Sequence, residues 1–234
     1  MRRPGDTTVV ARTGPAYHAA PLAFNVTVPL NAGVGVVMMD RWDPEETLRL
    51  IEEYRITHTH MVATMFHRLL ELPDDVKRRY DLSSLKLVMH GAAPCPVHVK
   101  HAIIDWLGPI VFEYYAATEG GGNYTIDAGT WLQKPGSVGR SPTPENTRVI
   151  DDAGNELGPG EVGTIYFRAP EVGRFEYFKS PEKTRKADRG RTGSTLAAAA
   201  TLGRSSTALP SSRGAAPRPS SPAESTFILR KSTR

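Results

Sequence analysis

Short apolar runs alternate with amphipathic stretches through the first half of the chain, and this alternation restricts the fold more than any other feature. The strand-like runs lie at residues 35–39, 57–62, 85–89 and 110–112. The stretches at 43–54, 65–72 and 97–107 place apolar residues at helical spacing. Strand–helix repetition predicts a layered α/β fold, in which flanking helices cover a mostly parallel sheet.

One helix start can be assigned to a residue. Asp43 suits an N-cap, Pro44 suits the first helical turn, and Glu45 and Glu46 suit the positive end of the helix dipole. We therefore expect a helix that begins directly after Asp43.

The pattern changes after about residue 140. Residues 147–150 and 163–168 are strand-like, and turn-forming residues lie between them at 152–155 and 158–160. We therefore expect residues 1–140 to form part of an α/β subdomain and residues 141–190 to begin a short β-rich subdomain.

Composition changes again near residue 190. The chain has a net charge of +4, but seven basic residues and one acid lie in residues 191–234, so residues 1–190 are slightly acidic. The tail is rich in Ser, Thr, Ala, Pro and Arg, which predicts disorder, with a basic interaction tail as the alternative. Because the basic charge belongs to the tail, we expect no nucleic-acid partner for the folded part.

Cellular context is constrained by two further features. No apolar run is long enough to cross a membrane, and Cys95 is the only cysteine, which excludes a disulfide framework. We expect a cytoplasmic protein, with peripheral membrane association as an alternative. The sequence does not predict an oligomeric state.

Three loops at predicted strand ends are candidate binding segments. Residues 91–94 (Gly-Ala-Ala-Pro) are small enough for a flat ligand to approach the backbone. In residues 114–122, Tyr114 and Tyr115 are suited to stacking on a base, and Glu119 is suited to Mg²⁺. In residues 14–21, His18 is suited to gating a pocket. The alternatives are a flexible polar loop at 114–122 and a packed structural histidine at position 18.

These loops resemble the motifs of a known family. The similar segments are Gly14-Pro15-Ala16-Tyr17-His18-Ala19-Ala20-Pro21, Gly91-Ala92-Ala93-Pro94, Tyr115-Ala116-Ala117-Thr118-Glu119, Lys134-Pro135-Gly136-Ser137-Val138-Gly139-Arg140 and residues 160–168. In order and spacing, the chain resembles the AMP-forming acyl-CoA synthetases, whose superfamily includes luciferases and the adenylation domains of peptide synthetases. The resemblance runs from about residue 5 to residue 188, and Ala116 replaces the usual glycine.

The resemblance implies a ligase reaction in which a carboxylic acid, expected to be fatty or otherwise hydrophobic, reacts with ATP and then with coenzyme A. It implies that His18 lies between the acyl pocket and the reaction centre, that Thr118 contacts a phosphate, and that Glu119 binds Mg²⁺. It also implies that ATP or AMP is bound by Gly91, Ala92, Ala93, Pro94, Tyr114, Tyr115, Ala116 and Thr118.

Other family motifs do not occur. Residues 1–17 hold no glycine-rich phosphate loop of the S-G-T-T-G-x-P-K-G type, and the T-G-D segment and the C-terminal domain with its catalytic lysine are also missing. We therefore expect an internal fragment of a longer ligase with an incomplete α/β domain. The alternative is a truncated, inactive protein that retains at most weak nucleotide binding.

The tail is also explained by a change of reading frame. After a one-base slip, residues 221–233 are compatible with I-S-G-G-V-N-I-Y-P-A-E-I-D, a segment that these ligases carry beyond T-G-D. We therefore predict that residues 191–234 are an out-of-frame translation.

Two histidine pairs are candidate metal ligands. His58 and His60 share a strand face, and His98 and His101 share a helix face. Neither pair has a third ligand nearby in sequence, so we expect no zinc site.

Overall fold

The computed structural model describes residues 8–117, 122–158, 161–168, 175–187, 196–206 and 226–229. The chain divides into two compact units. Unit 1 consists of Met1–Tyr114 and Asp127–Gln133, and unit 2 consists of Tyr115–Ile126 and Lys134–Arg234. The subdomain boundaries that we expect at residues 140 and 190 remain predictions.

A six-stranded sheet has the strand order β2-β1-β3-β4-β5-β6. The pairs β1–β2, β1–β3, β3–β4 and β4–β5 are all parallel. Its strands are β1 (Val9–Arg12), β2 (Gly35–Met38), β3 (His58–Met61), β4 (Leu87–His90), β5 (Val111–Ala116) and β6 (Gly122–Asp127). The mostly parallel α/β fold predicted from the strand–helix alternation is therefore confirmed.

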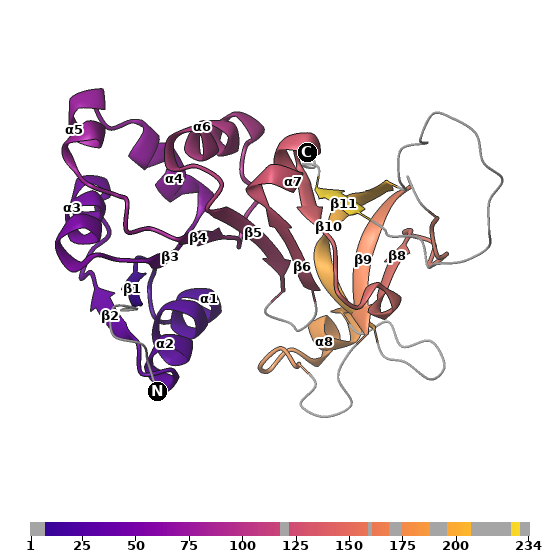
Figure 1. Cartoon of the computed structure of the whole chain (residues 1–234). Coiled ribbons are helices and arrows are strands. Elements are labelled where there is room, and N and C mark those ends of the chain that lie inside the picture. Colours follow the sequence, from indigo (N-terminus) through magenta and orange to yellow (C-terminus); the bar gives the residue numbers. More distant parts are fainter. Residues whose placement is uncertain are drawn as a thin grey trace, which may run out of the picture. The chain divides into compact units, whose positions relative to one another are not determined.

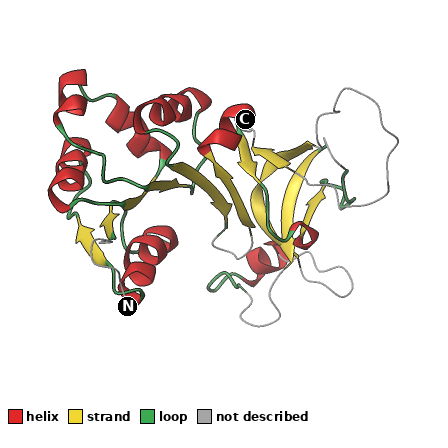
Figure 2. Cartoon of the chain, in the orientation of Figure 1, coloured by secondary structure: helices red, strands yellow, loops and turns green. Residues whose placement is uncertain are grey.

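Helices cover both faces of this sheet in unit 1 (Figures 1 and 2). The π-helix η1 packs on β1 and β3, and α1 and α2 continue it at either end. The side chains of α4 and α6 contact the opposite face. The helices of unit 1 are α1 (Ala19–Leu22), η1 (Ala23–Thr27), α2 (Val28–Asn31), α3 (Pro44–Tyr54), α4 (Ala63–Leu70), α5 (Asp74–Arg79), α6 (Val97–Leu107) and α7 (Ala128–Gln133).

Helix α3 begins as the sequence predicts. The carboxylate of Asp43 accepts a hydrogen bond of 2.9 Å from the backbone N–H of Glu46, and Pro44 occupies the first turn. The helix ends at Arg55, whose φ of 50° is left-handed and stops the helical backbone. Leu48 and Ile51 lie on its buried face.

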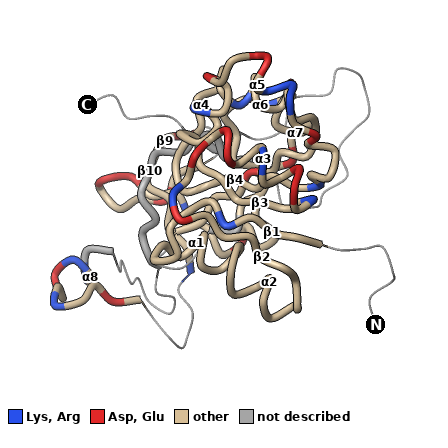
Figure 3. Tube along the Cα trace, turned by 90° about the vertical axis from the view of Figure 1, so that its left-hand side faces the viewer, with Lys and Arg blue, Asp and Glu red and all other residues tan. Residues whose placement is uncertain are grey.

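Charge is distributed unevenly over the helices of unit 1. Helix α5 consists almost entirely of charged residues, whereas residues 19–31 contain none (Figure 3). This uncharged segment still presents apolar side chains to solvent, because Val28 and Leu30 are each 59% exposed and Leu22 is 43% exposed. The segment is therefore an exposed apolar surface of unit 1.

Unit 2 contains a five-stranded sheet with the order β7-β11-β10-β9-β8. The pairs β7–β11, β10–β11, β9–β10 and β8–β9 are all antiparallel, which confirms the expected β-rich part. Its core consists of Tyr124, Val138, Val149, Ile165 and Phe167. The elements of this part are β7 (Ser137–Gly139), η2 (Pro144–Asn146), β8 (Thr147–Ile150), β9 (Val162–Arg168), α8 (Pro181–Ala187), β10 (Leu196–Ser206) and β11 (Thr226–Leu229).

Strands β10 and β11 lie within residues 191–234, the range in which we expect disorder. Strand β10 pairs with β9, and β11 pairs with β10 and β7. A sheet ladder uses the N–H and C=O groups that every non-proline residue carries, so pairing does not require an apolar sequence. The other residues of this range lie outside the described part of the chain.

No helix in the described residues is long and apolar enough to span a membrane. Helices α3 and α6 have only 11 residues each.

Candidate functional site

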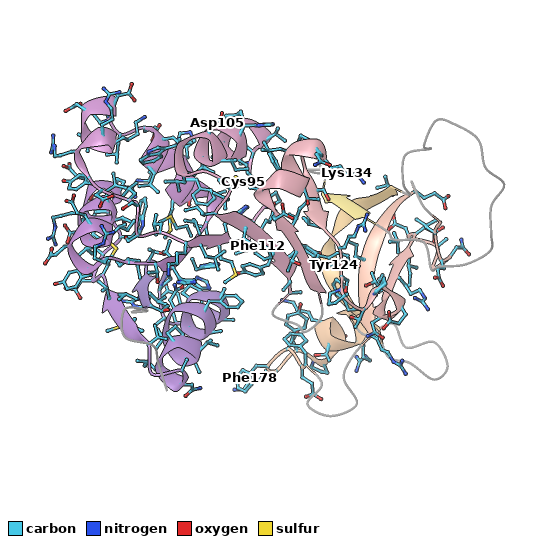
Figure 4. All side chains as sticks on the ribbon, in the orientation of Figure 1. Cys95, Asp105, Phe112, Tyr124, Lys134 and Phe178 are labelled. Atoms are coloured by element: carbon cyan, nitrogen blue, oxygen red, sulfur yellow. The ribbon has the colours of Figure 1, made fainter. Side chains whose placement is uncertain are left out.

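Two rows of side chains cross the middle of the parallel sheet on opposite faces. His60 pairs with Met89, and Met89 pairs with Phe112. In the next row, Met61 pairs with His90, and His90 pairs with Glu113. Successive side chains in a strand point to opposite faces, so the two rows face different helices. Phe112 is labelled on β5 in Figure 4.

Three rings form an aromatic cluster (Phe24, His60 and Tyr114) on the face covered by η1. The Phe24 ring lies 5.9 Å from the His60 ring and 5.2 Å from the Tyr114 ring, measured between centroids. His60 Nε2 and the Tyr114 hydroxyl share a hydrogen bond of 2.9 Å. Burial lowers the pKa of His60 to about 4 and raises the pKa of Tyr114 to about 12, so both groups are neutral near pH 7.

The helix that supplies Phe24 is irregular. Residues Ala23–Thr27 form a π-helix, a distortion that is frequent at functional sites. Its central Asn25 is 1% exposed and donates a hydrogen bond of 2.7 Å to the carbonyl oxygen of Ala11. Asn25 Oδ1 has no hydrogen-bond partner among the described residues. The π-turn thus fixes Phe24 over the ends of β1 and β3.

The Gly-Ala-Ala-Pro loop (residues 91–94) begins where β4 ends, as the sequence predicts. Gly91 is buried against Tyr114, and a Cβ atom at Gly91 would lie 2.6 Å from the Tyr114 ring. Ala92 has a φ of 70°, a left-handed conformation that is uncommon for a residue with a side chain. Ala92, Ala93 and Pro94 are exposed, so a flat ligand has access to this backbone.

On the opposite face, buried ionisable groups form a charged cluster (His90, Lys100 and Glu113). Their exposed fractions are 0%, 1% and 6%. Lys100 Nζ donates a hydrogen bond to Glu113 Oε2, and His90 Nε2 lies 3.7 Å from the same oxygen. Phe66 packs edge-on against the His90 ring, and Lys100 Nζ lies 4.6 Å from the centre of the Trp131 ring.

Burial dominates the ionisation of this charged cluster. Desolvation raises the pKa of Glu113 and lowers the pKa of Lys100, in opposition to their mutual attraction. Desolvation also lowers the pKa of His90 to about 3, and the nearby Lys100 adds to this effect. Neither ring nitrogen of His90 has a hydrogen-bond partner among the described residues.

Tyr115 and Ala116, the next residues on β5, belong to unit 2. The half-buried Tyr115 ring lies 6.1 Å from the Tyr124 ring and 6.4 Å from the Phe167 ring. Ala116 is exposed. The side-chain environment of Tyr115 is therefore the aromatic core of unit 2.

The remaining predicted site residues have different placements. His18 is the exposed N-cap of α1, and its ring lies 4.9 Å from the Tyr17 ring. Thr118 and Glu119 lie outside the described residues, so their predicted contacts with phosphate and Mg²⁺ remain predictions.

The structure brings together some predicted residues and adds others. Gly91 and Tyr114 are in contact, whereas Phe24 and the His60–Tyr114 hydrogen bond are new. The sequence signal for His60 is its alternation with His58, which places the two on one strand face but does not identify Tyr114 as a partner. The described residues contain no cluster of three His, Cys, Asp or Glu side chains that could hold a metal ion.

Loops that are open to ligands at the carboxyl ends of a mostly parallel sheet define a class of α/β proteins that bind small molecules at this edge. Within that class, the profile of the family described as AMP-binding enzyme matches residues 2–175, well over half of the sequence. The chain therefore belongs to the AMP-binding enzyme family.

Individual relatives agree with this assignment. The chain is 34% identical over 173 residues to the medium/long-chain-fatty-acid–CoA ligase FadD8 of Mycobacterium tuberculosis, an alignment that covers 73% of this chain and 29% of the relative. It is 34% identical over 175 residues to the pyochelin synthase PchD of Pseudomonas aeruginosa, covering 71% of this chain and 31% of the relative.

The fold of the chain is also similar to that of a solved structure. The ATP-bound crystal structure of MatB from Rhodopseudomonas palustris matches with a TM-score of 0.68 and 24% identity, covering 95% of this chain and 39% of that protein. The chain thus spans about a third of the length of the curated relatives named above.

Proposed function

We propose that this chain is the nucleotide- and acid-binding part of an AMP-forming acid–thiol ligase. The observation that carries the proposal is the match to the AMP-binding enzyme family over residues 2–175, which includes every candidate loop. In the proposed reaction, a carboxylate oxygen attacks the α-phosphorus of ATP, and pyrophosphate leaves. The thiol of coenzyme A then attacks the acyl carbon, and AMP leaves.

The proposed roles follow the motif positions. Gly91, Ala92, Ala93 and Pro94 border the adenine and the acid, and their small side chains leave the backbone accessible. Tyr114, Tyr115 and Ala116 contact the nucleotide. His18 separates the acid from the reaction centre. Thr118 contacts a phosphate oxygen, and Glu119 holds Mg²⁺, which neutralises phosphate charge.

The proposed acid has an uncharged, hydrophobic tail. The aromatic cluster lies at the carboxyl ends of β3 and β5, and the shifted pKa values of His60 and Tyr114 keep it neutral near pH 7. A neutral, largely apolar wall favours a fatty or aromatic group over a second carboxylate, which would need a charged partner. The fatty-acid substrate in the name of the M. tuberculosis relative supports the same choice.

A second candidate is a ligase fragment that binds nucleotide weakly and catalyses nothing. What supports it is that the chain spans only about a third of the length of the curated relatives named above. The two candidates differ in whether acyl-AMP is formed.

Two measurements on the full chain test the proposal. Isothermal titration with AMP tests nucleotide binding, and exchange of labelled pyrophosphate into ATP tests acyl-AMP formation with decanoate, palmitate, cinnamate or succinate. We expect exchange with the first three acids and none with succinate. AMP binding without exchange would leave the second candidate, and no AMP binding would refute both.

A matched pair of variants assigns the metal role. Glu119→Gln should abolish the Mg²⁺-dependent exchange but preserve AMP binding measured without Mg²⁺. Glu145→Gln removes the same charge from an exposed position in η2 and should change neither. Equal exchange rates for the two variants would show that Glu119 does not hold the metal.

A further inference from the structure

The Gly-Ala-Ala-Pro loop contains a strained residue. Ala92 has a φ of 70°, which brings its Cβ atom close to backbone oxygen, a conformation that glycine adopts without cost. Such conformations persist only where the surrounding structure enforces them. The loop itself is exposed at Ala92, Ala93 and Pro94, so the constraint must come from its ends.

The residues of the charged cluster lie on the elements that flank the loop. His90 is the last residue of β4 and directly precedes Gly91. Lys100 lies near the start of α6 (Val97–Leu107), the helix that follows the loop. Glu113 directly precedes Tyr114, whose ring and carbonyl oxygen contact Gly91. One ion pair therefore links β5 to α6, the helix that follows the loop.

Stability alone does not account for this ion pair. Desolvation of two buried charges offsets most of their attraction, and apolar residues of similar volume are often at least as stabilising in such positions. A charge-assisted hydrogen bond does impose a direction and a distance that apolar packing would not. The cluster is thus suited to fixing the position of α6 relative to β4 and β5.

We propose that His90, Lys100 and Glu113 are positioning residues that hold the Gly-Ala-Ala-Pro loop in its strained, ligand-binding conformation. The proposal rests on the proposed function for the identity of the ligand, an adenine nucleotide. The positioning itself can be measured without any ligand, because Cys95 is the only cysteine of the chain and lies at the end of the loop.

The test begins with Lys100→Met combined with Glu113→Gln, which removes both charges at nearly constant volume and leaves no unpaired buried ion. The first measurement is the rate at which iodoacetamide alkylates Cys95. We expect a rise of about tenfold, the factor that corresponds to relaxing one residue from the left-handed region. The matched control is Arg49→Met, which removes exposed ion pairs with Glu46 and Glu53 on α3 and should leave the rate unchanged.

Ala92→Gly distinguishes positioning from a general loss of packing. Glycine adopts φ of 70° without strain, so the loop should keep its conformation even when the ion pair is gone. Adding Ala92→Gly to the double variant should therefore return the alkylation rate to within about twofold of the wild-type rate. Because Ala92→Gly changes no charge, this rescue cannot come from an altered thiol pKa.

AMP affinity is the second measurement. The double variant should bind AMP about tenfold more weakly than the wild type. The same two substitutions made in an Ala92→Gly background should weaken AMP binding by less than about twofold relative to Ala92→Gly alone. If the wild type binds no AMP but alkylation behaves as described, the positioning holds and the proposed function fails. If the double variant melts cooperatively with an unchanged alkylation rate, or Ala92→Gly reverses nothing, the positioning proposal is wrong.

His90→Leu provides a second test in case the Lys100→Met/Glu113→Gln variant does not fold. His90→Leu removes one member of the cluster, keeps the ion pair and nearly conserves volume. If the double variant lacks a cooperative melt, the same comparison is made with His90→Leu, alone and with Ala92→Gly. A raised alkylation rate that Ala92→Gly reverses supports the proposal, and an unchanged rate overturns it.

Discussion

Gly91→Ala is the substitution whose effect the structure defines most sharply. A Cβ atom at this position would lie 2.6 Å from Cε1 and Cζ of Tyr114 and 2.8 Å from the carbonyl oxygen of Tyr114. The ring can rotate away only by breaking its 2.9 Å hydrogen bond with His60. The carbonyl oxygen belongs to β5, which is paired with β4, so it cannot move independently.

Overpacking of this kind costs about 1–3 kcal/mol. Gly35→Ala in β2 is the matched control, because a Cβ atom there would meet nothing within 4 Å and the residue has no positive φ. It should be neutral or stabilise the protein by about 0.4–1 kcal/mol, because alanine restricts the unfolded chain. The two variants make the same chemical change in unit 1, one directly after β4 and one in β2, and only Gly91→Ala should destabilise the protein.

Urea unfolding followed by tryptophan fluorescence measures the difference in unit 1. All three tryptophans of the chain, at positions 42, 106 and 131, belong to this unit. With a urea dependence of about 2 kcal/mol per molar, a loss of about 2 kcal/mol lowers the midpoint by about 1 M. Tyr114→Ala should remove part of the Gly91→Ala penalty in a double-mutant cycle. Equal midpoints for Gly91→Ala and Gly35→Ala would refute the argument.

Three further outcomes follow from burial and exposure. The pKa values of His60 (about 4) and His90 (about 3) in the folded protein lie below the ordinary 6.5. Between these values and pH 6.5, the unfolded chain therefore binds more protons than the folded protein. The free energy of unfolding should therefore fall as pH is lowered from 7 to 5, and His60→Phe should flatten this slope. Burial, with the charge of Glu113, raises the pKa of Cys95 to about 12, so its alkylation rate should still be rising at pH 10 rather than reaching a plateau. Replacing the exposed Val28 and Leu30 with lysine should increase the soluble fraction at equal expression, and an unchanged fraction would show that this surface does not limit solubility.

Local signals were sufficient to place many elements of unit 1. The helix expected at 97–107 is observed as Val97–Leu107, and the cap at Asp43 is observed with its hydrogen bond. These features depend on neighbours within a few residues, which the sequence contains. Strand β1 (Val9–Arg12) was not predicted, because four residues carry little periodic signal and its place between β2 and β3 is decided by pairing.

The aromatic cluster could not be derived from the sequence. His60 and Tyr114 are 54 residues apart, and Phe24 reaches them through a π-turn that no sequence pattern marked. Contacts of this kind arise from the order of strands in the sheet. Periodicity can assign a side chain to a face, but it cannot identify the partner on that face.

The charged cluster, in contrast, left a signal in the sequence. Lys100 shares the spacing i, i+3, i+4 with Ile103 and Ile104, which are buried, and Glu113 shares a strand face with the buried Val111. A charged residue on the buried face of a helix, followed by one of opposite charge on the buried face of the next strand, predicts a buried ion pair.

The two clusters are linked by the strand period itself. Glu113 and Tyr114 are consecutive in β5, so their side chains point to opposite faces of the sheet, and Gly91, which meets Tyr114, directly follows His90 at the end of β4. A shift of β5 along β4 that relieved a clash at Gly91 would therefore also move Glu113 away from Lys100. The penalty of Gly91→Ala should accordingly be smaller in the Lys100→Met/Glu113→Gln background, where β5 is free to move. If the penalty is the same in both backgrounds, strand position is set by the ladder hydrogen bonds alone, and the charged cluster does not position the loop.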